Sequence, residues 1–373
     1  MRHRSQFRNA TAIDTQLDRR NLADGWDNRV NRAPAPSGAA VACAWDAPHA
    51  CSGGRQLDEV AQALSPLGAP VIVFSASHSG SRLLARMLQR LGVFMGSNLN
   101  DSEDSLDVFE LVRYLVERHA PDYSRLFCEG DVALRPRALA AFNAHVADCP
   151  PGRRWGWKLP ETSHVMPVMA RLFPNARCVH LVRDGRDVAF SPFLAPKARF
   201  WRKIYFNDER IYSWRGHAMT QRAYRSHGHI FNAARWVNSV TLGRAHGAML
   251  GERYLEVRYE ALVANPGAEL TRLARFLGVS DAPDQADWSD VRSQSVGKWR
   301  TQPVRHLAEI RPIMEPTLGA FGYDWPDGSS LGDTVTRALD RVSRLLTAGG
   351  GVPAGPRAEP GGLGGLFRVR TQR

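Results

Sequence analysis

The stretch that decides the fold is VIVFSASHSGSRLLARMLQRLG, residues 71–92. A short apolar run, Val71–Phe74, is followed by small residues and then by leucine and methionine at helical spacing. A strand, a small-residue loop and a helix in this order typically hold a phosphate group at the helix N-terminus. The loop lacks the lysine of an ATP- or GTP-binding P-loop, so the stretch predicts an anion site of another kind.

The composition predicts a globular protein. The chain has 373 residues, of which 43% are hydrophobic and 23% charged. No apolar run approaches the ~20 residues of a membrane span. Because the N-terminus also lacks the apolar core of a signal peptide, we expect a cytoplasmic protein. The five cysteines show no metal-ligand spacing, so neither a metal site nor a disulfide framework is expected.

Three segments differ in pattern. Residues 1–66 are polar and lack sustained periodicity, and residues 347–373 are rich in glycine and proline, so both are expected to be disordered. Residues 67–346 alternate short apolar runs with helical patterns. This alternation predicts a P-loop-like, three-layer α/β fold with a central, mainly parallel sheet flanked by helices. Ligands of such sheets bind at the carboxyl ends of the strands.

The positive charge belongs to the predicted domain. The net charge is +12, and residues 67–346 carry +8 of it, which indicates an anionic ligand or substrate. Nucleic acid would also fit this charge. However, the sequence contains no zinc finger, no aromatic RNA-binding signature and no uninterrupted basic run.

A second motif, CVHLVRDGRDVAFS, spans residues 178–191. A predicted buried strand brings Arg183 to its end, and a predicted helix brings Ser191 eight residues later. Arg183 can bind a phosphate with two parallel hydrogen bonds, and Ser191 can donate another. Ion pairs among the arginines and aspartates of the motif would explain the same pattern equally well.

Four elements together resemble the sulfotransferases that use 3′-phosphoadenosine 5′-phosphosulfate (PAPS). Residues 71–92 resemble their 5′-phosphosulfate loop, and residues 178–191 resemble their 3′-phosphate motif. VRYEALVANPGAELTRLARFLGV (257–279) is similar to the family's Tyr-Glu-Asp-Leu segment, and SVGKWR (295–300) to its C-terminal Gly-basic-Trp-Arg element. The elements occur in the family's order across residues 70–325, most like bacterial-type carbohydrate or small-molecule sulfotransferases.

The resemblance implies which residues bind PAPS and its product, 3′,5′-adenosine bisphosphate (PAP). Arg183 and Ser191 would hold the 3′-phosphate, and Tyr259 would lie near the adenine. The loop would hold the 5′-phosphosulfate, and the C-terminal element would close over the cofactor. The residues expected to bind in these two segments are His78, Ser79, Gly80, Ser81, Arg82, Leu83, Gly297, Lys298, Trp299 and Arg300.

His78 departs from the family pattern, which has lysine or arginine at this position. The imidazole would supply a positive charge to the transferring group only if the bound anion keeps it protonated. Alternatively, Arg82 supplies the charge, or His78 is an exposed loop residue without a role.

A third motif, WGWKLPETSH (155–164), contains the expected catalytic lysine. Lys158 stands roughly where cytosolic family members carry a catalytic histidine, and where other branches use lysine to stabilise the transferring sulfuryl group. Those other branches take their base from an earlier acidic loop, here GSNLNDSEDSLD (96–107). We expect Glu103 as the base, then Asp104, then His164, although acidic residues are equally typical of a solvated helix start.

The expected reaction is metal-free, in-line transfer of a sulfuryl group from PAPS to a hydroxyl or amine of a carbohydrate or other small metabolite. Residues 197–235 hold nine basic and two acidic residues among aromatic ones, which suits a wall for an anionic saccharide or a solvated basic helix. Two alternatives stay open: a nucleotide-dependent kinase, and a basic polyanion- or nucleic-acid-binding protein on an inactive sulfotransferase-like fold.

Overall fold

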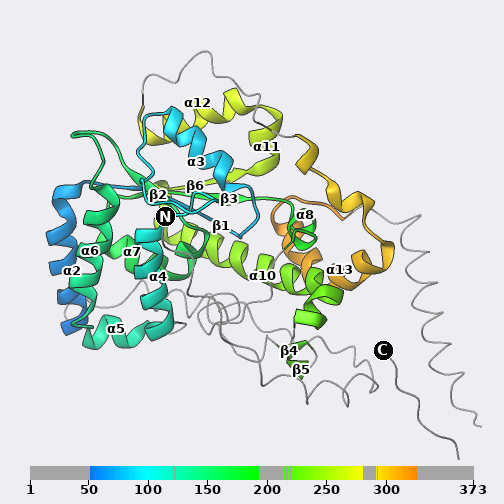
Figure 1. Ribbon diagram of the computed structural model, residues 1–373, viewed down its shortest axis with the longest axis horizontal. Helices are drawn as coiled ribbons and strands as arrows, with labels where there is room; N and C mark the ends of the chain where they lie inside the picture. Colours follow the sequence, from blue (N-terminus) through cyan, green and yellow to red (C-terminus); the bar gives the residue numbers. More distant parts are fainter. Residues whose placement is uncertain are drawn as a thin grey trace, which may run out of the picture. The chain divides into compact units, whose positions relative to one another are not determined.

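A four-stranded parallel sheet lies at the centre of the protein (Figure 1). The strands are β1 (Val71–Ser75), β2 (Gly156–Lys158), β3 (Arg177–Val182) and β6 (Tyr254–Arg258). Their order is β2-β1-β3-β6, and every neighbouring pair is parallel. The loops after the two central strands, β1 and β3, therefore leave the sheet at the same edge. This confirms the predicted α/β class.

The computed structural model describes residues 51–120, 123–192, 213–214, 217–218, 221–279, 291 and 293–325. These all belong to one compact unit, Met1–Trp325. The second unit, Pro326–Arg373, lies outside the described residues, as does most of the expected acceptor region 197–235.

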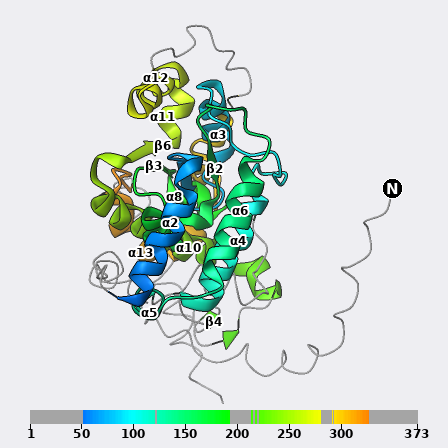
Figure 2. The same cartoon turned by 90° about the vertical axis from the view of Figure 1, so that its left-hand side faces the viewer.

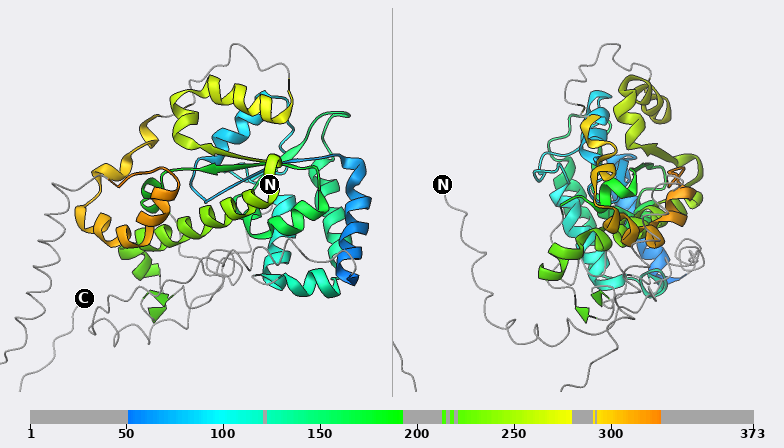
Figure 3. Two further views of the ribbon diagram at one scale, coloured as in Figure 1. Left: turned by 180° about the vertical axis from the view of Figure 1, so that it is seen from behind. Right: turned by 90° about the vertical axis from the view of Figure 1, so that its right-hand side faces the viewer.

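Helices cover both faces of the sheet (Figures 1 and 3). One face carries α3 (Ser81–Arg90), α11 (Tyr259–Ala264) and α12 (Pro266–Leu277). The other carries α10 (Gln221–Leu250), α7 (Met166–Leu172), α2 (Ser52–Leu64), α4 (Leu106–His119), α5 (Ser124–Glu129) and α6 (Leu134–Val146), several of them seen from the side in Figure 2. Among the described helices, none is long and apolar enough to cross a membrane.

Shorter elements and one further helix complete the described chain. Helices α8 (Gly185–Ala189) and α13 (Val304–Ala320) pack against α10. A small antiparallel pair consists of β4 (Ser213–Trp214) and β5 (His217–Ala218). The 3-10 helices are η1 (Ser65–Leu67), η2 (Pro160–Val165), η4 (Gly251–Arg253), η5 (Ser293–Ser295) and η6 (Lys298–Thr301).

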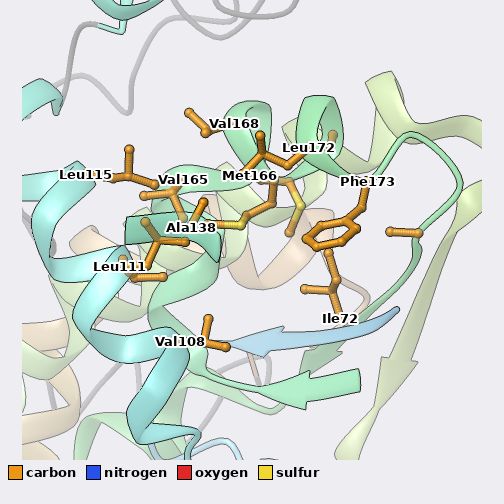
Figure 4. Close-up of a cluster of buried hydrophobic side chains, with 14 of the residues drawn as sticks. Ile72, Val108, Leu111, Leu115, Ala138, Val165, Met166, Val168, Leu172 and Phe173 are labelled. Atoms are coloured by element: carbon orange, nitrogen blue, oxygen red, sulfur yellow. The ribbon is translucent and has the colours of Figure 1, made fainter. Parts of the chain in front are cut away.

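Strand β1 is buried on both faces, as a continuous apolar run in a parallel sheet predicts. Val71 and Val73 pack into one cluster with side chains of α3 and α12. Ile72 and Phe74 belong to the opposite cluster, with α2, α4, α6 and α7, part of which is shown in Figure 4. Each fully buried side chain of this size contributes roughly 1.5–3 kcal/mol, so β1 is anchored firmly beneath the loop that follows it.

The N-terminal boundary of the folded region differs from the prediction. Residues 52–64, expected to be disordered, form helix α2 and bury Leu57, Val60 and Leu64 completely. Their apolar stripe is only two turns long and lies in a polar neighbourhood, so its pattern is weak until α5, α6 and α7 pack against it. Residues 1–50 and the predicted tail 347–373 lie outside the described residues.

Helix α10 is kinked near its N-terminal end, at His227, whose backbone is not helical (φ −134°, ψ 20°). Gly243 does not interrupt the helix. A Cβ atom at Gly243 would lie 2.5 Å from the ring of His180 in β3, so this glycine allows α10 to pack closely against the sheet.

Three buried histidines predict a loss of stability in mild acid. Burial lowers the pKa of His164 and of His180 to about 3, and that of His246 to about 4. Below about pH 6.5 the unfolded chain binds protons at these histidines while the folded chain does not. The stability that these histidines contribute by staying neutral is therefore complete above about pH 6.5 and is lost as the pH falls toward 4.

We expect the free energy of unfolding, from denaturant titration, to fall by roughly 2–5 kcal/mol between about pH 7.5 and about pH 5. Equal stability at both values would contradict this.

Candidate active site

The loop between β1 and α3 has the features of an anion site. Gly80 is the N-cap of α3 in the left-handed conformation (φ 85°), and neither a capping side chain nor an acidic residue occupies the first turn of this helix. Ser79 is fully buried, and its Oγ has no hydrogen-bond partner among the described residues. A buried hydroxyl without a partner costs roughly 1–3 kcal/mol. A bound anion would supply the missing acceptor.

Gly80 lies directly beneath the ring of Tyr259. A Cβ atom on Gly80 would lie 2.3 Å from Tyr259 Cε2, so only glycine fits there without displacing the ring. Tyr259 begins α11, immediately after β6, and is buried. The tyrosine expected near the adenine is thus placed on the anion loop by the sheet itself.

Arg183 connects the β1 loop to the C-terminal element. It follows β3, and its Nη1 donates a hydrogen bond to the carbonyl oxygen of His78 at 3.2 Å. Its Nη2 donates to the carbonyl oxygen of Ser295. The guanidinium carbon lies 4.7 Å from the centre of the Tyr259 ring. Arg183 is only 8% exposed, and its Nε has no partner in the described part of the chain. All four sequence elements therefore meet around this side chain.

Asp187 attaches the C-terminal element to α8. Its carboxylate accepts hydrogen bonds from the backbone amides of Gly297 (2.8 Å) and Trp299 (2.9 Å). Gly297 makes this turn possible because its φ is 78°. Asp187 Oδ2 is also 3.6 Å from Arg183 Nη2. The sequence left open whether the charges of this motif pair among themselves; Asp187 does pair with Arg183 and also accepts the two backbone amides.

The other charged pair of the motif supports the tryptophan of the C-terminal element. Arg186 and Asp184 form a buried ion pair at 2.8 Å. The guanidinium of Arg186 lies 3.9 Å from the ring centre of Trp299, which is itself buried. Lys298 and Arg300, on either side, are exposed. Trp299 is thus the anchor of this element, while its two basic neighbours lie at the surface.

Ser191 lies beyond the short helix predicted to carry it, because α8 ends at Ala189. Its Oγ donates a hydrogen bond to the carbonyl oxygen of Asp187 at 3.0 Å. Asn232 of α10 donates to the carbonyl oxygens of Ser191 (2.9 Å) and Ala189 (3.0 Å). Ser191 is therefore held just beyond the end of α8 by the backbone of Asp187, the residue whose carboxylate binds the C-terminal element.

His78 is in an environment that favours its neutral form. Burial, followed by the charges of Arg235 and Arg183, lowers the pKa of His78 to about 4. The positive charge beside the loop therefore comes from Arg235 and Arg183 at neutral pH. Arg235 is fully buried in α10, and the sequence assigned it only to a broad basic region. Its orientation depends on the packing of α10 against the sheet, which no local motif reveals.

Lys158 holds the acidic loop against the end of β2. Its Nζ donates to Asp104 Oδ1 at 2.6 Å and to the carbonyl oxygen of Ser102, and the residue is 2% exposed. Glu103 does not make this contact. Its Oε1 pairs with Arg86 of α3 at 2.9 Å, and its backbone is left-handed (φ 62°). The structure thus brings Asp104, the second choice for the base, to Lys158, the lysine expected to be catalytic.

The remaining predicted residues lie at the edges of the site. Arg82 is exposed, and its Nη1 donates to the carbonyl oxygen of Asp101 at 3.3 Å. Leu83 packs against the apolar cluster above the sheet, and Ser81 is buried in the first turn of α3. His164 is linked to Tyr123, whose hydroxyl donates to the His164 carbonyl oxygen at 2.8 Å.

Glu161 is a site residue that the sequence analysis missed. It is buried in η2, which follows the strand β2 that carries Lys158, and its Oε1 accepts a hydrogen bond from Ser77 Oγ at 3.3 Å. A carboxylate therefore supports the anion loop from the side of β2. Its position three residues after Lys158 was the only local signal.

A family model described as "Sulfotransferase family" matches residues 70–284, which is more than half of the chain. The chain belongs to the sulfotransferase family. The matched range contains the β1 loop, Lys158, Arg183 and Tyr259, whereas the C-terminal element lies beyond it. Most of the candidate site of this sulfotransferase therefore lies within the residues that the family model matches.

Carbohydrate sulfotransferases are among the relatives of this sulfotransferase. Carbohydrate sulfotransferase 3 of Tetronarce californica is 21% identical over 215 residues, covering 51% of this chain and 45% of the relative. Carbohydrate sulfotransferase 3 of Homo sapiens is 24% identical over 176 residues, covering 40% and 34%. The chain thus spans less than half the length of these curated relatives. Among solved structures, the sulfotransferase domain from the Synechococcus PCC 7002 olefin synthase is 22% identical, with a TM-score of 0.42, covering 69% of this chain and 96% of that chain.

The contact between Gly80 and Tyr259 predicts a specific defect in nucleotide binding. Gly80→Ala adds a methyl group that overlaps the Tyr259 ring, at a backbone conformation that costs alanine roughly 1–2 kcal/mol. We expect the affinity for PAP, measured by calorimetry, to fall by roughly tenfold or more.

Gly152→Ala is the matched control. Gly152 has a similar φ of 75°, is exposed, and has no described atom within 4 Å of the added Cβ. This variant should carry the backbone strain and keep the wild-type PAP affinity. Equal affinities in the two variants would contradict the role assigned to the Gly80–Tyr259 contact.

Proposed function

We propose that this protein transfers a sulfuryl group from PAPS to a hydroxyl or amine of an acceptor, a carbohydrate or another small metabolite. One observation carries the proposal. Arg183, at the end of β3, donates a hydrogen bond to the backbone of His78 in the loop after β1, at 3.2 Å and beside Tyr259. Two strand ends suited to anions thus form one site, as a nucleotide with phosphates on its 3′ and 5′ sides requires.

The residues present fit such a nucleotide. The orphaned Ser79 hydroxyl, Gly80 and the N-terminus of α3 would hold the 5′-phosphosulfate. Arg183, whose Nε lacks a partner among the described residues, would bind the 3′-phosphate together with Ser191. Tyr259 offers a ring for the adenine, and Trp299 anchors the element that closes the site.

PAPS, when bound, supplies an activated sulfuryl group. The Lys158 ammonium stabilises negative charge that develops as the acceptor oxygen bonds to sulfur and the phosphate oxygen leaves. The Asp104 carboxylate takes the proton of the acceptor. Its contact with Lys158 at 2.6 Å favours Asp104 over Glu103, because Glu103 is engaged by Arg86 on the other side of the loop.

A saccharide acceptor is supported by the names of the relatives, which are carbohydrate sulfotransferases. The residues expected to contact it, 197–235, are described only in part. The direct test is transfer of labelled sulfate from PAPS to a panel of glycans and small hydroxylated metabolites. Transfer to a member of the panel supports the proposal. Absence of both transfer and PAP binding would contradict it.

Substitution of Lys158 should separate catalysis from cofactor binding. We expect Lys158→Ala to lower kcat by roughly 100-fold or more, because a buried, preorganised charge is removed from the transition state. Its affinity for PAP should stay within about threefold of wild type, since Arg183 and the β1 loop are unchanged. A Lys158→Ala variant with wild-type turnover would remove this residue from the mechanism.

The two neighbouring acids give a matched comparison. Asp104→Asn should lower kcat by roughly 100-fold or more through loss of the base. Glu103→Gln should change kcat by only a few-fold, because it weakens an ion pair with Arg86, a side chain that is 43% exposed. Both rates are measured with the best acceptor of the panel. The reverse ranking would make Glu103 the base.

A further inference from the structure

Three side chains that can bind metal converge between two helices, outside the proposed cofactor site. His229 lies on α10, and His306 and Glu309 lie one turn apart on α13. The Nε2 atom of His229 is 2.6 Å from Glu309 Oε2, and the rings of His229 and His306 stack with their centres 4.4 Å apart. The three ligand atoms, one from each residue, all lie within 4.8 Å of one another.

The surroundings of this cluster are apolar on one side and accessible on the other. Phe190, at the end of α8, stacks on His229 with ring centres 5.7 Å apart, and it lies 6.5 Å from the His306 ring. His229 is buried, whereas His306 and Glu309 are half-buried, so an ion can enter from solvent.

We propose that His229, His306 and Glu309 form a binding site for a divalent transition-metal ion of the Zn²⁺ type. Two imidazole nitrogens and one carboxylate oxygen are ligands that Zn²⁺ and Co²⁺ accept. His306 and Glu309, three residues apart on one helix, face a histidine on another, and metal sites in helix bundles are built from side chains on facing helices. Ligand atoms of a tetrahedral zinc ion lie roughly 3.3 Å apart. On binding an ion, His229 Nε2 and Glu309 Oε2, now 2.6 Å apart, would separate, and the ligand atoms that lie up to 4.8 Å apart would come closer.

The position of the cluster indicates what the metal would do. Helix α13 follows directly after η6, the element whose backbone amides are bound by Asp187. The metal would join α13 to α10 beside Phe190, and so hold the C-terminal element in place without taking part in chemistry. The sequence analysis expected no metal because the ligands come from segments far apart in the chain. Only the pair His306 and Glu309 has a local spacing.

The test uses the full chain after removal of metal with a chelator. Titration with Co²⁺ should give one equivalent of visible absorption typical of tetrahedral coordination, and Zn²⁺ should displace it. Glu309→Gln and His306→Ala should each weaken Zn²⁺ binding by roughly tenfold to 100-fold or more. Zn²⁺ should raise the Tm of the wild type and not that of these variants.

Glu315→Gln is the matched control on the same helix. Glu315 pairs with Arg311 at 2.7 Å and lies outside the cluster, so this variant should bind Zn²⁺ as the wild type does. Wild-type Zn²⁺ affinity in Glu309→Gln and His306→Ala, or no stoichiometric binding to the wild type, would overturn the proposal. If His306→Ala fails to fold by circular dichroism, Glu309→Gln decides alone. PAP binding is measured in parallel, so failure of the metal site and failure of the proposed function are distinguishable.

Discussion

The hydrogen bonds and charge of one buried guanidinium, that of Arg183, hold the site together. The side chain leaves the central strand β3, contacts the backbone of the β1 loop at His78, and contacts the C-terminal element at Ser295. Tyr259 covers it at 4.7 Å. Because β1 and β3 are adjacent and parallel, the two loops can meet only at this edge of the sheet. The strand order therefore determines which loops meet at the site.

Several buried cations gather in this region. Arg183, Arg235 and Lys158 are all buried; Lys158 pairs with Asp104, and Asp187, which lies 3.6 Å from Arg183, also accepts the amides of Gly297 and Trp299. Desolvation of several like charges is costly unless an anion is shared among them. The charges of Arg235 and Arg183 lower the pKa of His78 to about 4, after the larger effect of its burial. An anionic cofactor explains why such a site is retained in a chain with a net charge of +12.

Much of the fold and of the site could be predicted from the sequence because the signals are local. A pattern of only a few residues predicts the strand, loop and helix of residues 71–92, and likewise the strand formed by the apolar run before Arg183. The rest depends on contacts between distant segments. Helix α2 has too short an apolar stripe to be recognised alone, and Gly243 is explained only by the His180 ring against it. The preference for Asp104 over Glu103, the orientation of Arg235 and the cluster at His229 likewise follow from packing between helices and loops.

The most direct test of the central claim is the affinity of wild type and Arg183→Gln for PAP and for adenosine 5′-monophosphate, measured by calorimetry. If Arg183 serves the 3′-phosphate of a nucleotide whose other end lies in the β1 loop, the variant loses affinity for PAP by roughly tenfold or more, and loses clearly less for the monophosphate, which feels only the lost hydrogen bond to the β1 loop. An equal loss for both nucleotides, or no preference of the wild type for PAP, would contradict the account.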